Sequence, residues 1–122
     1  MSIPKNATYS MIVTQLLEHE RKAAKITQGE FFKSTGISQS TCSRINRGMA
    51  HLSLEEMRSA CRTLNMKMDS LMNDADRASQ LLPENEGIKI LDNVKGGESK
   101  SILPTIIAGA ALGYLVFRLL KK

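Results

Sequence analysis

The stretch that decides the fold occupies residues 27–48 and reads TQGEFFKSTGISQSTCSRINRG. Thr27 is followed three residues later by Glu30, which is the spacing of a capping box at the start of a helix. Gly36 can adopt the positive φ that ends this helix. Ser38 can then cap a second helix, which the glycine at the end of the stretch terminates. The stretch therefore predicts two short helices joined by a tight turn.

Helical patterns flank this pair on both sides. Thr8 or Ser10 can cap a first helix, whose apolar residues recur on one stripe. After the pair, Ser53 and Glu56 form a second capping box. A short fifth helix is expected over residues 66–72.

Five helices within residues 1–73 predict a small all-α domain. Its expected core consists of apolar residues on the inner faces of these helices: Ile12, Leu16, Ile26, Phe31, Phe32, Ile37, Cys42, Ile45, Leu54, Met57, Ala60, Leu64, Met68 and Leu71. These side chains suffice for one core of modest stability.

The run GISQSTCSRINRG at residues 36–48 resembles the Cro-like, lambda-repressor-like helix-turn-helix family, also called the xenobiotic-response-element type. The resemblance extends from about Leu17 to Met72. It implies a five-helix DNA-binding domain that binds as a dimer, on half-sites about one DNA turn apart. We therefore expect a homodimer or higher homo-oligomer, formed through the fifth helix, the segment after it or the C-terminal tail.

The second helix of the motif has an inner and an outer face. Three residues are expected to face inward: Ile37, Cys42 and Ile45. Four side chains are left to enter the major groove: Gln39, Ser40, Ser43 and Arg44. A Gln amide can pair with adenine and an Arg guanidinium with guanine, so these residues are the expected base readers, led by Gln39. The alternative for each is a solvated helix face.

Further residues are expected to contact phosphates. Arg47 and Lys33 flank the outer face and carry positive charge. The family resemblance implies that Gln28 and Ser38 contact the DNA backbone and position the domain on it. Both lie at helix N-termini, where N–H groups face phosphate.

The motif departs from the family pattern at four positions. Gly29 weakens its helix by up to about 1 kcal/mol. Phe32 stands where a small residue is usual, and Thr35 where a Leu is usual. We expect Phe32 to fill the volume that Thr35 gives up. Lys25 replaces a glycine that ends the first helix.

Composition supports a polyanionic partner. The chain has 122 residues with a formal net charge of +5, which favours nucleic acid or an anionic membrane surface as a partner. The absence of Trp and the few aromatic residues argue against RNA modules that stack bases. Cys42 and Cys61 are expected to be small core residues, and no spacing predicts a metal site, a cofactor or an enzymatic centre.

Residues 74–101 are polar and acidic on balance, with Pro83 and two adjacent glycines. We expect a mostly mobile linker here. Two parts could be ordered, because residues 74–82 can continue as a helix and residues 87–91 can form a short strand.

The C-terminal residues 102–122 predict an apolar helix, and residues 101–117 carry no charge. Gly109 and Gly113 form a Gly-x-x-x-Gly face that permits close helix pairing. The favoured interpretation is a membrane anchor through residues 102–120, and the alternative is an oligomerisation helix. The basic residues after the apolar run would lie outside the membrane, which weakens the first interpretation.

The sequence thus predicts a sequence-specific transcriptional regulator, with repression as the expected role. It would lie in the cytoplasm, tethered to the cytoplasmic membrane if the tail inserts. The alternative is a protein-interaction module that the apolar tail delivers to a membrane or a partner assembly.

Overall fold

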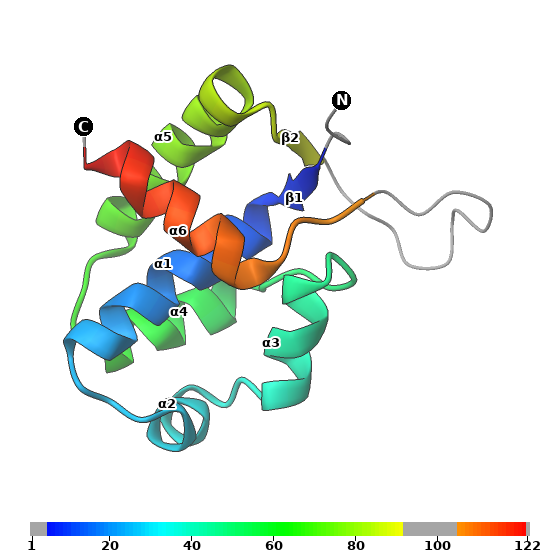
Figure 1. Cartoon of the computed structure of the whole chain (residues 1–122). Helices are drawn as coiled ribbons and strands as arrows, with labels where there is room; N and C mark the ends of the chain where they lie inside the picture. Colours follow the sequence, from blue (N-terminus) through cyan, green and yellow to red (C-terminus); the bar gives the residue numbers. More distant parts are fainter. Residues whose placement is uncertain (1–4, 92–104, 122) are drawn as a thin grey trace.

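Six helices and two short strands make up the part of the chain that the structure, a computed structural model, describes: residues 5–91 and 105–121 (Figure 1). In chain order these elements are β1 (Asn6–Thr8), α1 (Tyr9–Ala23), α2 (Gln28–Thr35), α3 (Gln39–Asn46), α4 (Leu54–Thr63), α5 (Met68–Glu86), β2 (Lys89–Leu91) and α6 (Gly109–Leu120).

Capping side chains begin the first four helices. The hydroxyl of Thr8, Thr27, Ser38 or Ser53 accepts a hydrogen bond from the backbone N–H three residues later, at 3.0–3.1 Å. Each bond satisfies an N–H group that the helix cannot pair internally. The predicted helix starts are confirmed, with Thr8 rather than Ser10 at the first.

Most of the expected core is buried or packs against the buried residues. Leu54 is the exception, and its predicted place in the core is wrong, because it is 67% exposed. It is the first residue of α4, and the buried face of that helix begins only at Met57.

Helix α5 runs without a break across the boundary that was expected after residue 73. Leu71, Ala75, Ala78 and Leu82 recur at helical spacing and are buried, and α5 packs against α1 and α6. The two ordered parts that the sequence allowed within residues 74–101 are both present, a helix through residues 74–82 and a short strand within residues 87–91. The remainder of the expected linker, residues 92–101, lies outside the described residues.

Strands β1 and β2 pair in parallel, with Asn6 opposite Lys89 and Thr8 opposite Leu91. A second connection joins the same strand to the segment before α6: Asn6 N donates to Thr105 O at 2.7 Å, and Ile107 N donates to Asn6 O at 2.9 Å. The start of the domain is thus held by two segments from the second half of the chain.

Helix α6 lies across α1 and α5 of its own chain (Figure 1). Leu112, Val116 and Leu119 are buried in this contact. The Gly-x-x-x-Gly face is turned toward α1, since a Cβ at Gly113 would lie 2.5 Å from Gln15 Oε1. The close approach predicted for Gly109 and Gly113 therefore serves packing within the chain.

Two polar or aromatic contacts hold the outer end of α6. The His19 ring of α1 stacks on Phe117, with ring centroids 4.0 Å apart. Arg118 forms an ion pair with Glu86 at the end of α5.

The membrane-anchor interpretation is not supported. No helix within the described residues has the length and apolar character needed to cross a membrane. Helix α6 has 12 residues, whereas a spanning helix needs about 20.

Candidate DNA interface

The turn between α2 and α3 is built by a glycine and a buried threonine. Gly36 adopts φ +77°, and its N–H donates to Phe32 O at 3.0 Å. Thr35 donates its hydroxyl to Phe31 O at 2.8 Å and accepts from Ile37 N at 3.1 Å. The threonine that replaces the usual leucine thus bonds one backbone group of α2 and one of the turn, a role that its side-chain volume does not indicate.

Two neighbouring helices hold the helix-turn-helix in place. Helix α2 packs against α4, and α3 packs against α1. Ser59 of α4 also donates its hydroxyl to Thr35 O at 3.2 Å. The inward residues of the motif follow the prediction, because Ile37 and Ile45 are buried and Cys42 is half-buried.

The outer face of α3 is polar and open to solvent. The expected base readers are all exposed: Gln39, Ser40, Ser43 and Arg44. Ile45 points the opposite way and is fully buried, so the orientation of the helix is fixed. Ser38 caps this helix, so its hydroxyl already has a partner in Thr41 N.

The residues expected to contact phosphates are exposed as well. Lys33 lies in the last turn of α2, and Arg47 follows α3 directly. Residues 31–54 contain these cations and Arg44 but no Asp or Glu. The one carboxylate of the helix-turn-helix, Glu30, is bonded to Thr27 at the start of α2, so the part from the last turn of α2 through α3 carries only positive charge, which favours phosphate contact.

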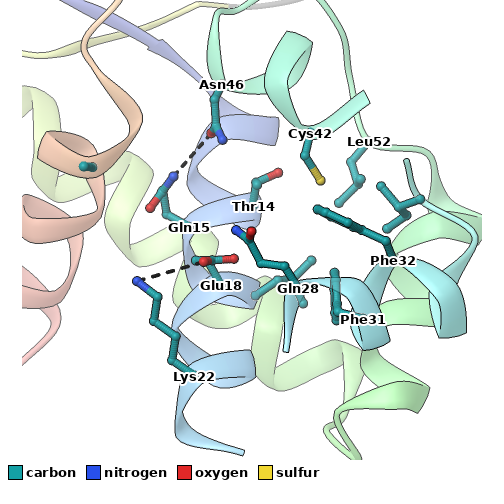
Figure 2. Close-up of a pocket in the computed structure, with 13 residues that line it drawn as sticks. Thr14, Gln15, Glu18, Lys22, Gln28, Phe31, Phe32, Cys42, Asn46 and Leu52 are labelled. Carbon is teal, nitrogen blue, oxygen red and sulfur yellow. Dashed lines mark hydrogen bonds and ion pairs between the residues drawn. The ribbon is translucent and has the colours of Figure 1, made fainter. Parts of the chain in front are cut away.

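Gln28 is placed differently from the other expected contacts. It begins α2, and its side chain extends over a cavity between α1 and α2 toward Glu18 (Figure 2). The pKa of the Glu18 carboxyl is held below its usual range, chiefly by the hydrogen bond from Arg21, with a smaller contribution from Gln28. Gln28 is itself exposed, so the amide expected at the DNA backbone lies at the rim of this cavity.

Helix α6 contacts the far end of α3, a connection that the sequence had not indicated. A Cβ added at Gly109 would lie 3.2 Å from Asn46 Cγ, and Gln15 donates to Asn46 Oδ1 at 3.3 Å. Ile106, just before α6, covers Gly48. The segment from Ile106 to Gly109 therefore supports the C-terminal end of the helix that carries the expected base readers.

Both cysteines are free thiols. Burial raises the pKa of Cys42 and of Cys61, so both stay protonated at neutral pH. No group of His, Cys, Asp and Glu side chains within residues 5–91 and 105–121 is arranged to hold a metal ion.

Residues 17–71 match the model of the helix-turn-helix family. This match supports the lambda-repressor-like helix-turn-helix family that the sequence predicted, whose domains bind DNA in transcriptional regulators. The curated proteins and the solved structures that were compared with the chain gave no match.

Proposed function

We propose that this protein is a sequence-specific transcriptional repressor that binds double-stranded DNA as a homodimer. The observation that carries the proposal is the outer face of α3, where four polar side chains are exposed while Ile45 anchors the opposite face. Gln39 and Arg44 read base edges, and Ser40 and Ser43 add contacts in the same groove. A dimer occupying a promoter would repress by excluding polymerase.

The phosphate contacts come from Lys33, Arg47 and the N-terminal ends of α2 and α3, where Gln28 and Ser38 lie. They set the register of the domain on the duplex. Base specificity comes from α3.

Salt dependence tests this division of roles. Using a site selected from random duplexes, we expect the logarithm of the association constant to fall linearly with the logarithm of salt concentration, by about 0.9 per phosphate neutralised. Lys33→Ala should weaken binding to all sequences and reduce the slope by about 1. Arg62→Ala removes the same charge from an exposed position on α4 and is the control. Binding that ignores salt would contradict the proposal.

We propose a dimer contact outside α5 and α6, on the surface that follows α3. The apolar faces of α5 and α6 are buried within one chain, so neither is open to a second copy. Met49 and Leu54, 62% and 67% exposed, lie on the segment that follows α3 and leads into α4. We place the dimer contact there, beside the DNA-reading helix.

Leu54→Glu should therefore abolish cooperative occupation of paired half-sites. Sedimentation should show a smaller species than the parent chain at the same concentration, and binding to a single half-site should persist. Tyr114→Glu alters an equally exposed residue on α6 and should leave association unchanged. A Leu54→Glu protein that still binds paired sites as a dimer would refute this surface.

A further inference from the structure

A cavity of about 250 Å³ lies between α1, α2 and α3 (Figure 2). For comparison, an apolar cavity of about 150 Å³ can hold benzene. The space is therefore large enough for one ring with a substituent. It is a feature that DNA reading does not use, because the base readers point away from it.

One side of the cavity is apolar and aromatic. Its apolar lining comes mainly from α2, the turn and α3: Leu17, Phe31, Phe32, Ile37, Cys42 and Leu52. The two phenylalanine rings meet edge to face, with centroids 6.2 Å apart. Phe32 stands where a small residue is usual in this fold, and its ring lines the cavity (Figure 2). Such a wall favours the face of a planar ring.

The opposite side carries polar groups from α1. The Thr14 hydroxyl is buried and has no hydrogen-bond partner within the protein. A buried hydroxyl without a partner is rare and costly, because it has lost its bonds to water. The neighbouring amide of Gln28 also lines the space (Figure 2). A ligand with a hydroxyl or a similar group on its rim would satisfy Thr14.

The charges around the cavity favour an uncharged ligand. Both oxygens of Glu18 are bonded by Arg21, at 3.2 and 2.6 Å, so they are poorly available to a cation. Lys22 is the only lining cation among the described residues, and its Nζ lies 3.9 Å from the same carboxylate. An anion bound to Lys22 would be repelled by the neighbouring carboxylate of Glu18.

We propose that this cavity binds a small uncharged aromatic molecule, with its ring against Phe31 and Phe32 and its polar group on Thr14. The proposal does not require the proposed function, although Gln28 lines the cavity and is also one of the expected contacts to the DNA backbone. Its lining includes Cys42 and Asn46 of α3, which places the ligand in contact with the helix that carries the base readers.

The experiment uses phenol and benzene as probes of the full chain by two-dimensional NMR. Both should shift the amide signals of Thr14, Gln28 and Cys42. Thr14→Val keeps the shape but removes the hydroxyl, so phenol affinity should fall by about three- to tenfold while benzene affinity stays unchanged. Cys42→Leu fills the cavity and should weaken both probes.

Three results would overturn the site. The first is that neither probe shifts these amides up to its solubility limit. The second is that Thr14→Val binds phenol as tightly as the parent chain. The third is that benzoate binds more tightly than phenol, which would contradict the uncharged class. Thr14→Val is expected to fold, since it removes only a hydroxyl that has no partner in the protein.

Discussion

In a Leu112→Ala variant, we expect the free energy of unfolding to fall by about 2–5 kcal/mol, which is a large part of the stability of a domain this small. Leu112 is fully buried where α6 packs against the rest of the domain. Truncating it removes apolar contacts and leaves a cavity. Urea denaturation followed by circular dichroism measures the change.

The control is Tyr114→Ala on the same helix. Tyr114 is 66% exposed, so this larger truncation should change stability by no more than about 0.5 kcal/mol. If Leu112→Ala unfolds at all temperatures, Leu119→Ala near the end of α6 offers a milder test of the same contact. Equal stability of the Leu112 and Tyr114 variants would show that α6 does not pack on the domain.

Gln39→Ala and Arg44→Ala should each lower affinity for a selected DNA site by about 1–3 kcal/mol, which is roughly five- to 150-fold. Each substitution removes two potential hydrogen bonds to one base edge. Discrimination at that base position should therefore relax, while discrimination elsewhere in the site is kept. Binding assays on a panel of single-base variants measure both effects.

Arg62→Ala again controls for the loss of one positive charge, and stability should stay within about 0.5 kcal/mol because the replaced side chains are exposed. If both α3 variants lost affinity equally for every sequence, these residues would contact phosphates only. If neither lost affinity, a different surface would bind the DNA.

The helix-turn-helix could be predicted because its determinants are local. Thr27, Glu30, Gly36 and Ser38 act within three or four residues of themselves, and each has the role that its spacing indicated. The exposed face of α3 followed from the same periodicity. Its contacts with bases remain predictions, because a side chain that reads bases and one that only faces solvent are equally exposed in the unbound protein.

The rest of the fold depends on contacts that local patterns do not specify. The apolar residues of α6 indicate that the helix is buried, but not which surface buries it. A membrane, a second copy of the chain or the rest of the same chain would each cover such a helix. Strand β1 has only three residues, and its partners lie more than 80 residues away. In residues 74–91, the polar composition favours a linker, whereas the narrow apolar stripe that includes Ala75 and Leu82 indicates a packed helix. The structure follows the stripe.

The cavity could not be predicted from the sequence either. Phe32 was identified as unusual, but the expectation was that it would fill the space left by Thr35. Thr35 is buried and bonded to backbone groups of α2 and of the turn, and the Phe32 ring also borders an open space between helices. Whether a large residue fills or creates space depends on how far the backbone moves, which residue volumes do not determine.

The attachment of Asn6 to residues near 89 and 106 has a consequence for the order in which the domain assembles on the ribosome. The helix-turn-helix can form from neighbours in sequence as it emerges, whereas β1 must wait for its partner segments, which are translated much later. Until α6 emerges, the parts of α1 and α5 that α6 covers remain exposed, and the nascent chain is more prone to aggregation and chaperone binding. Nascent α3 thus leaves the ribosome well before the segment that supports its end.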